Sequence, residues 1–500
     1  MPSSMNRTDD RLHPTARAAA ALAGLALCAS TSLAGDSPLV PGELILRAEN
    51  PKQLAAATVA LSAQFADVGV IDSIQGRPIY LLSYSLDATQ TADDAHAALD
   101  ALTAAGVVTW AELNYEGRSG EGQTDSLWLS GLAFPPDAFE AQYAADLLGL
   151  DAAHARSRGQ GVTIAIVDTG IDGTHPIFGG RVSPIGASFV AGSPSASDIG
   201  DGVDNDADGL VDEQVGHGTF VAGLVHLVAP EAKLLSARVL DSEGRASTYA
   251  ITKALAWSID RGAHIVNMSL GETYRSQTLE DVVEEAMSKG IVVVGAAGNS
   301  ATEEPEEFPA CDGSACGVSA LDADDIRGGF SSFGVKIDLA APGVTDFVGK
   351  NPVLSRAIVG PIPGGGLAVW QGTSFATAFV SGTMALVRAQ HPDWPNAEVP
   401  ASGILDTMLA TLGSTGVAID KINPMYAGML GTARISASGA ALVGPIAIPA
   451  EDLTLDGDVD AVDLAAILIG WGPCEPGERA DFNGDGLVDA ADVTRVLLAW

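Results

Sequence analysis

Four apolar segments of similar length constrain the fold of this chain more than any other feature. They read VTIAIVDTG from Val162, KLLSARVLD from Lys233, AHIVNMSLG from Ala263 and GIVVVGAAGN from Gly290, and each ends in small or polar residues. Amphipathic helices are predicted between them over residues 248–261 and 279–289. Continuous apolar strands separated by helices indicate an α/β fold, with a parallel sheet that is covered by helices on both faces.

Three ends of these predicted elements carry residues suited to nucleophilic catalysis. Asp168 closes the first strand, His217 opens an apolar helix, and Ser374 begins another helix. Functional groups gather at the carboxyl ends of parallel strands. A serine in the first turn of a helix offers a nucleophilic oxygen and a backbone N–H that the helix does not use. Taken singly, the three residues would more simply be a turn residue, a buried histidine and a helix cap.

The sequences around these residues resemble the signature blocks of the subtilisin-like serine proteases, the subtilases of peptidase family S8. The blocks are DTGID at Asp168, HGTFVAG at His217 and GTSFATAFVSG around Ser374. The resemblance extends to NMSLG, AAGN and AAPG and covers about residues 141–441. It implies a subtilisin-like sheet and a serine endopeptidase that cleaves protein or peptide substrates through an acyl-enzyme.

The resemblance also implies a role for each residue. Ser374 Oγ attacks the scissile carbonyl, His217 takes and returns the proton, and Asp168 orients and stabilises the imidazole. Asn299, in AAGN, supplies a donor for the oxyanion. The segment of NMSLG that binds substrate consists of Ser269, Leu270 and Gly271.

Two departures from the family pattern keep a second class of function open. The family usually has proline where Ala378 stands, and histidine is common where Phe379 stands. Together with acidic loops elsewhere, they would suit a weak or inactive calcium-dependent binding protein of the cell surface on a subtilase scaffold. Reaction of Ser374 with a serine-directed phosphonate discriminates between the two classes.

Residues 1–34 have the pattern of a secretory signal peptide. Arginines precede an apolar run over residues 18–27, and small residues at Ser32 and Ala34 stand where a signal peptidase reads the chain. A lipoprotein anchor at Cys28 is the weaker alternative, because Leu27 stands where a small residue is needed. No later segment is long enough to span a bilayer, so we expect a secreted or surface protein.

Charge and cysteine content restrict the partners. The 63 acidic and 26 basic residues give a formal net charge of −37, which disfavours nucleic acid and anionic membranes and favours divalent cations. We expect a monomer.

In an oxidising compartment Cys311 and Cys316 would close a short disulfide, or they would be free surface thiols, and Cys474 has no evident partner.

Residues 40–115 read as a small α+β unit, with the strand-like runs ELILRA and PIYLLSYSL and an alanine-rich helical stretch after them. By the resemblance this unit is the propeptide, which assists folding and blocks the active site; an accessory domain is the alternative. A linker is predicted over residues 116–140. Cleavage during maturation is expected between Tyr115 and Tyr143.

The loop before His217 has the character of a calcium site. Its ligands would be Asp204, Asp206, Asp208 and Asp212, in the order D-x-D-x-D-G-x-x-D. Bound calcium would fix the start of the helix that carries His217. Val215 stands where a closing carboxylate is usual, so a solvated acidic loop is the alternative.

The C-terminal segment contains an internal repeat, since residues 452–471 align with residues 481–500. The pair resembles a dockerin type I module with truncated EF-hand loops, a small α domain over residues 452–500. Its calcium ligands would be Asp452, Thr454, Asp456, Asp460 and Asp463, then Asp481, Asn483, Asp485, Asp489 and Asp492. The resemblance implies a cohesin-like partner, although the module could only tether or cap the chain, or hold no metal.

Overall fold

The computed structural model describes residues 38–121, 129–205, 209–303, 307–397 and 399–443, with residues 464, 468, 471–473 and 487–499 of the C-terminal segment. The predicted signal peptide, Cys28 and Cys474 lie outside these ranges. So do ten of the predicted calcium ligands: Asp206, Asp208, Asp452, Thr454, Asp456, Asp460, Asp463, Asp481, Asn483 and Asp485.

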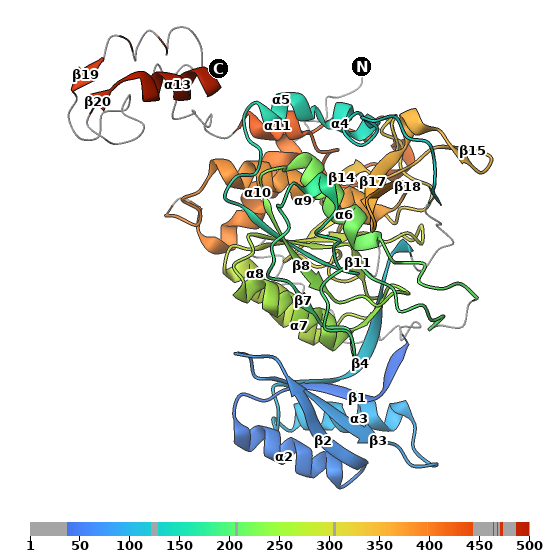
Figure 1. Ribbon diagram of the computed structural model, residues 1–500. Coiled ribbons are helices and arrows are strands. Elements are labelled where there is room, and N and C mark those ends of the chain that lie inside the picture. Colours follow the sequence, from blue (N-terminus) through green and yellow to red (C-terminus); the bar gives the residue numbers. More distant parts are fainter. Residues whose placement is uncertain are drawn as a thin grey trace, which may run out of the picture.

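A seven-stranded parallel sheet forms the centre of the larger unit (Figure 1), in the order β14-β13-β12-β10-β6-β8-β7. The strands are β6 (Thr163–Asp168), β7 (Ala187–Ser188), β8 (Lys233–Arg238), β10 (Ile265–Met268), β12 (Val292–Ala296), β13 (Cys316–Leu321) and β14 (Leu339–Pro342). The four apolar segments of the sequence are β6, β8, β10 and β12 in the middle of this sheet. The predicted α/β fold is confirmed.

Helices cover both faces of the sheet, as the continuous apolar strands require. In β6, Ile164 and Ile166 belong to the core that includes α6 (His217–Val228) and α9 (Thr373–Gln390). The alternate residues Ala165 and Val167 belong to the core that includes α7 (Thr248–Asp260) and α8 (Gln277–Ser288). Successive side chains of a strand point to opposite faces, so one strand feeds both cores.

The departures from the family pattern lie within α9. Ala378 and Phe379 are fully buried there. Ala378 keeps the backbone N–H that proline would lack, and α9 runs as one helix of 18 residues.

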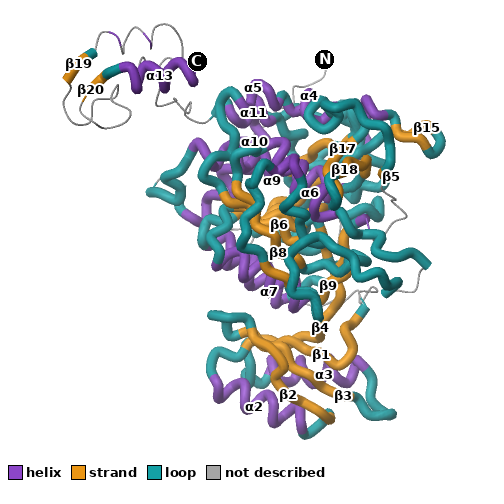
Figure 2. Tube along the Cα trace, in the orientation of Figure 1, coloured by secondary structure: helices purple, strands orange, loops and turns teal. Residues whose placement is uncertain are grey.

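The N-terminal unit is an antiparallel sheet in the order β4-β1-β3-β2, with two helices on one face (Figure 2). Its elements are β1 (Leu39–Arg47), α2 (Pro51–Ser62), β2 (Ala66–Ser73), β3 (Ile79–Ser85), α3 (Ala92–Ala104) and β4 (Trp110–Ser119). Leu44 and Leu46 of β1 pack in the unit's own core with α2 and α3. Ile45 between them packs in the core formed with α7 and α8, so the open face of this sheet docks on the larger unit.

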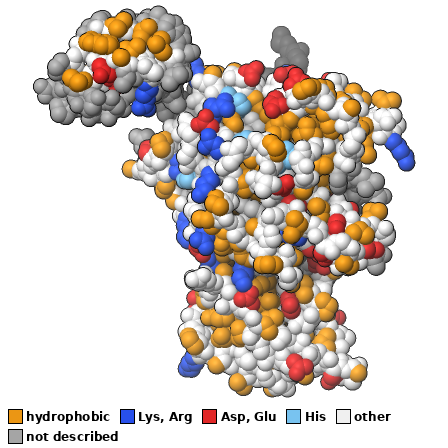
Figure 3. All heavy atoms as spheres, viewed as in Figure 1, with side chains coloured by type: hydrophobic (Ala, Val, Ile, Leu, Met, Phe, Trp, Pro, Cys, Tyr) orange, Lys and Arg blue, Asp and Glu red, His pale blue; other side chains and the backbone are white. Residues whose placement is uncertain are grey.

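Ion pairs border this contact between the units. Arg77 pairs with Asp260 of α7 at 3.0 Å and with Glu285 of α8 at 2.7 Å, and Arg47 pairs with Asp281 of α8 at 2.7 Å. In the surface view, Lys and Arg side chains gather along one flank of the larger unit and where the two units meet (Figure 3). The docking therefore combines apolar burial with charge pairing.

The end of β4 corrects the predicted boundary between unit and linker. Residues 116–119 continue the strand and pair antiparallel with β9 (Arg245–Ser247) on one side and β11 (Leu270–Gly271) on the other. The segment expected to be a linker from residue 116 is therefore strand up to Ser119. Its small and polar residues, GRSG, gave no sign of this pairing, because the partner strands lie far along the chain.

The chain has further strands and α-helices outside these two sheets and their covering helices. They are β5 (Leu129–Ser130), α4 (Tyr143–Leu148), α5 (Leu150–His154), β15 (Phe347–Val348), β16 (Asn351–Pro352), β17 (Ile358–Ile362), β18 (Gly366–Trp370), α10 (Ile404–Thr415), α11 (Ala437–Ala441), β19 (Gly472–Pro473), β20 (Leu487–Val488) and α13 (Ala490–Ala499). Cys311 and Cys316 are both free thiols, and Cys316 is buried in β13 rather than exposed. Within the described ranges, no helix is long and apolar enough to cross a membrane.

Candidate active site

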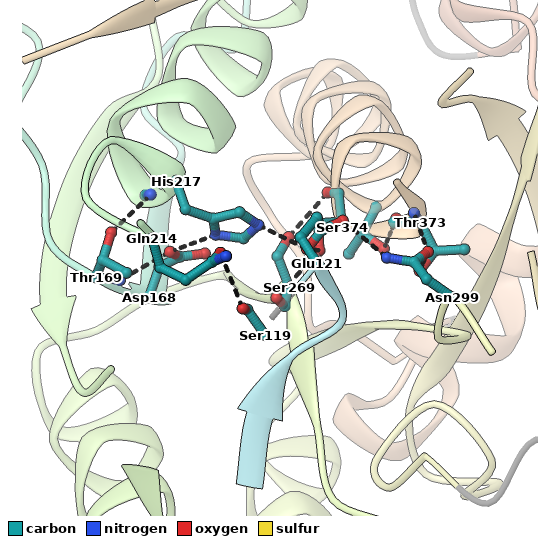
Figure 4. Close-up of polar contacts among 12 residues, drawn as sticks. Ser119, Glu121, Asp168, Thr169, Gln214, His217, Ser269, Asn299, Thr373 and Ser374 are labelled. Carbon is teal, nitrogen blue, oxygen red and sulfur yellow. Dashed lines mark hydrogen bonds and ion pairs between the residues drawn. The ribbon is translucent and has the colours of Figure 1, made fainter. Parts of the chain in front are cut away.

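Asp168, His217 and Ser374 meet at the carboxyl end of the sheet, although they come from distant parts of the chain (Figure 4). Asp168 ends β6, His217 is the first residue of α6, and Ser374 is the second residue of α9. His217 Nδ1 lies 2.7 Å from Asp168 Oδ1. All three residues are fully buried.

A buried carboxylate that sequence reasoning missed supports the start of α6. Asp198 Oδ1 accepts hydrogen bonds from the N–H of Gly216 at 3.0 Å and from the hydroxyl of Thr169 at 3.1 Å. Its Oδ2 accepts bonds from the N–H and the hydroxyl of Thr219. These four bonds fix the backbone on both sides of His217 and so help to orient its imidazole.

Gly218 is required where α6 comes closest to β6. A Cβ on Gly218 would lie 2.2 Å from the carbonyl oxygen of Gly170 and 3.0 Å from Asp168 Oδ1. Any side chain would push the helix away from the strand and lengthen the contact between His217 and Asp168. The glycine of the HGT block therefore serves the geometry of the site.

The side chain of Glu121, just after β4, occupies the space between His217 and Ser374 (Figure 4). Its Oε2 accepts a hydrogen bond from Ser374 Oγ at 2.7 Å and lies 2.9 Å from His217 Nε2. Its Oε1 accepts a bond from Asn299 Nδ2 at 3.1 Å. A substrate carbonyl cannot reach these groups while the carboxylate is in place.

The carboxylates on both sides of His217 set its protonation state. Burial alone would lower the pKa of His217, but Asp168 and Glu121 outweigh it and raise that pKa to about 10. Burial raises the pKa of Glu121, but the charge of His217 and the hydrogen bonds from His217, Ser374 and Asn299 outweigh burial, so this pKa is lowered. At neutral pH the imidazole is therefore protonated and cannot accept a proton from Ser374.

The amide of Asn299 is held so that its Nδ2 donates to Glu121. Its Oδ1 accepts bonds from the N–H of Thr373 at 2.9 Å and from the Thr373 hydroxyl at 3.0 Å. This assigns Nδ2 to the side that faces Glu121. Thr373 was not singled out from the sequence, although it stands in the same block as Ser374.

The predicted substrate-binding segment, residues 269–271, holds the end of β4 as an added strand. Leu270 stands opposite Ser119 and Gly271 opposite Arg118. The N–H of Ser119 also donates to the carbonyl of Gly244 at 2.9 Å, on the side of β4 that faces β9. The Ser269 hydroxyl donates to the carbonyl of Ser374 at 2.9 Å, which ties the segment to the start of α9. An extended segment of the chain therefore lies paired between β9 and β11.

A model of the Subtilase family matches residues 159–422, which include all three residues of the predicted triad. The chain belongs to the subtilase family. It is 37% identical over 276 residues to Subtilisin BL of Lederbergia lenta, which covers 53% of this chain and 90% of that protein. It is 35% identical over 253 residues to Subtilisin E of Bacillus subtilis (strain 168), covering 48% and 59% of the two chains.

The solved structure of a protease from Pseudoalteromonas arctica superposes on this subtilase with a TM-score of 0.52. The two chains are 25% identical, and the match covers 62% of this chain and 98% of that one. Family and fold together make this protein a serine endopeptidase of the subtilisin type. The family match ends before the C-terminal repeat, so the dockerin-like module stays a prediction.

Two of the four predicted calcium ligands in the loop before His217 of this subtilase are described. Asp212 accepts bonds from the N–H groups of Asp201 at 2.9 Å and Gly202 at 3.0 Å, and Asp204 accepts one from Gly209 at 3.1 Å. These carboxylates bind the backbone of their own loop. Across the described ranges, no three His, Cys, Asp or Glu side chains form a group that could hold a metal ion.

Asp489 and Asp492 are the two predicted ligands described in the C-terminal repeat. They lie at the start of α13, where the N–H of Asp489 donates to Asp492 Oδ2 at 3.0 Å. This bond is that of a helix cap. The other eight ligands of the repeat lie outside the described residues, so calcium binding there stays a prediction.

Proposed function

We propose that this subtilase is exported as an inactive precursor and becomes a secreted endopeptidase after cleaving its own chain beside Glu121. The observation that carries the proposal is the path of β4, which enters the cleft as an extended strand and places the Glu121 carboxylate against Ser374 and His217. The N-terminal unit is then the propeptide. Its docking on α7 and α8 holds the strand in place.

Departure of Glu121 would restore the chemistry of the triad. His217 would lose one of its two carboxylates, so its pKa would fall and it would become a general base. Ser374 Oγ would attack the scissile carbonyl as His217 Nε2 takes its proton, while Asp168 stabilises the imidazolium. Asn299 Nδ2 and the N–H of Ser374 would donate to the oxyanion. The imidazolium would then protonate the leaving amine, and water would hydrolyse the acyl-enzyme by the reverse steps.

The register of β4 suggests the bond that is cut. Ser119 and Arg118 pair with β11, and a Cβ on Gly120 would lie 2.9 Å from Asn299 Nδ2. Gly120 therefore lies beside the oxyanion donor, and Glu121 is the first residue beyond it. We place the maturation cleavage between Gly120 and Glu121. A small movement of the chain would first withdraw the Glu121 side chain from Ser374 and bring the Gly120 carbonyl into its place.

The test is the Ser374→Ala precursor purified away from other proteases. We expect it to keep its N-terminal unit, whereas the wild-type chain acquires a new N-terminus at Glu121 and takes up a serine-directed phosphonate at Ser374. Loss of the nucleophile should lower turnover by about 10⁶-fold, the size found for a subtilisin. A Ser374→Ala chain that still matures by itself would refute self-processing.

We also propose that calcium stabilises the chain through the loop before His217 and through the C-terminal repeat. The net charge of −37 and the spacing of the acidic residues support both sites. Calcium at a hundredfold excess over Kd would add about 2.7 kcal/mol of stability to each. Deletion of residues 452–500 should remove one chelator-sensitive melting transition and leave peptidase activity in place. If a chelator changes the melting temperature of neither the full chain nor the chain without residues 452–500, a stabilising role of calcium is excluded. A cohesin-like partner for the repeat rests on the dockerin resemblance alone.

A further inference from the structure

A buried carboxylate that the triad does not use lies under β4. Glu272 directly follows β11 and is 1% exposed. Its Oε2 accepts a hydrogen bond from the Thr248 hydroxyl at 2.5 Å, whereas Oε1 has no hydrogen-bond partner in the described part of the chain. A buried carboxylate oxygen without a donor is costly. Its presence in the wall of a peptide-binding cleft suggests that a substrate supplies the donor.

The residue of β4 that lies over Glu272 is a glycine. A Cβ on Gly117 would lie 3.3 Å from Glu272 Cγ and 2.8 Å from Ile251 Cδ1. The nearer atom is the end of a flexible side chain, and the carbonyl oxygen of Gly271 lies 3.3 Å away, so a substituent needs a shift of Ile251 and a slight movement of the strand. A side chain in the place of Gly117 would then extend between an apolar wall and the carboxylate.

The charge of Glu272 depends on β4. Burial and, to a smaller extent, the carboxylate of Glu112 on β4 itself raise the pKa of Glu272 to about 8. When β4 leaves, Glu112 leaves with it and water enters, so Glu272 ionises at neutral pH. The strongly acidic chain also attracts cationic peptides to the cleft.

We infer that Glu272 makes this subtilase prefer Lys or Arg four residues before the scissile bond, at the position that Gly117 occupies in β4. The stem of such a side chain would lie along Ile251 and its cationic group would donate to Glu272 Oε1. The inference rests on the proposed function, because it takes the register of β4 as that of a substrate. The glycine in β4 leaves this interaction unmade, so a basic substrate can displace the cleaved propeptide.

The test is a kinetic series on the matured enzyme with quenched fluorescent peptides of sequence X-Arg-Ser-Gly-Glu, which copies residues 117–121 with X in place of Gly117. We expect kcat/KM with X as Lys or Arg to exceed that with Leu by about tenfold, the factor of one favourable ion pair. The peptide with X as Glu should be slowest. In Glu272→Gln the advantage of the basic peptides should largely vanish, and in Glu272→Leu the Leu peptide should become the best.

Glu284→Gln is the matched control, because Glu284 is an exposed carboxylate of α8 and its loss changes the net charge equally. It should keep the preference for Lys and Arg. Equal rates for the Lys, Leu and Glu peptides with the wild-type enzyme, or an equal loss of preference in the control, would overturn the inference. Failure of the proposed function looks different, since no peptide would be cleaved and Ser374 would take up no phosphonate.

A second measurement needs no turnover. In the Ser374→Ala precursor above pH 8, where Glu272 is ionised even with β4 docked, Gly117→Lys should protect the amides of β4 from hydrogen exchange about tenfold more than Gly117→Leu. The difference should vanish when Glu272→Gln is added. Equal or better protection by Leu would show that the space over Glu272 accepts apolar side chains, and it would overturn the preference for a cation.

Discussion

The two ends of β4 carry buried carboxylates with opposite electrostatic behaviour. Near its start, Glu112 accepts hydrogen bonds from the hydroxyl of Ser276, the N–H of Gln277, and the N–H and hydroxyl of Thr278. All of these donors are neutral, and burial raises the pKa of Glu112. At the other end, Glu121 meets the imidazole of His217, and its pKa is lowered in spite of burial.

The comparison distinguishes a carboxylate that positions β4 on α8 from one whose charge sets the protonation of His217. Neutral donors at the first turn of α8 hold Glu112 in place as a helix cap, but they do not compensate fully for the loss of water. At the other end, the protonated imidazole of His217 holds Glu121 in its charged form, and the Glu121 carboxylate in turn helps to keep His217 protonated. We therefore expect substitutions at Glu112 to change how firmly β4 docks, and those around Glu121 to change the chemistry of the site.

Among variants that keep Asp168, His217 and Ser374, the largest effect should come from Asn299→Ala, which acts at the catalytic end alone. It removes the amide that donates to Glu121 Oε1 and that would donate to the oxyanion. We expect turnover of peptides to fall by about 10²- to 10³-fold with little change in KM. Steady-state kinetics of the matured enzyme measure this, and an unchanged turnover would rule out the oxyanion role.

Next in size is the effect of Glu121→Gln on His217, measured in the Ser374→Ala precursor. The substitution removes one of two carboxylates from the imidazole, so the pKa of His217 should fall from about 10 by about one to three units. The measurement is an NMR titration of histidine rings labelled with ¹³C. Glu116→Gln, in the same strand and outside the site, is the control. A pKa that stays near 10 in Glu121→Gln would mean that Glu121 does not hold the imidazolium.

The contact between His217 and Glu121 also predicts how the stability of the precursor depends on pH. His217 has a raised pKa when β4 is docked, so the stability from its pairing with Glu121 is fully present below about pH 6.5. That stability is lost as the pH rises through about 10. The Ser374→Ala precursor should therefore lose stability over this window, with a smaller slope in Glu121→Gln. Identical slopes in the two proteins would contradict the coupling.

The smallest effect should come from the other end of β4. In the same precursor, Glu112→Ala leaves the donors of Ser276 and Thr278 unpaired and should weaken docking of β4 by about 1–3 kcal/mol. Glu112→Gln keeps one acceptor and removes a charge that burial already disfavours, so it should cost less. Hydrogen exchange of residues 110–119 measures both. A Gln variant as damaging as the Ala variant would mean that the charge of Glu112 matters as much as that of Glu121.

Short-range patterns in the sequence determined the architecture and picked out the three residues of the predicted triad. A buried parallel strand must be apolar along its whole length, so β6, β8, β10 and β12 were visible in the sequence without any partner. The residues that end these strands, or that stand at the start of α6 and α9, were visible because they lie at the edges of these apolar runs. Each block also carries the glycines that its close contacts require, as Gly218 does.

Only the tertiary structure decided which groups reach the predicted triad from elsewhere. The segment around Glu121 has the small, polar composition of a linker, and its pairing with β9 and β11 depends on strands more than a hundred residues away in the sequence. Asp198 and Glu272 also lie in segments without a repeating pattern. Their roles come from burial and from one or two contacts across the fold. A sequence shows where a carboxylate stands in the chain, but its charge and function depend on what the folded chain brings beside it.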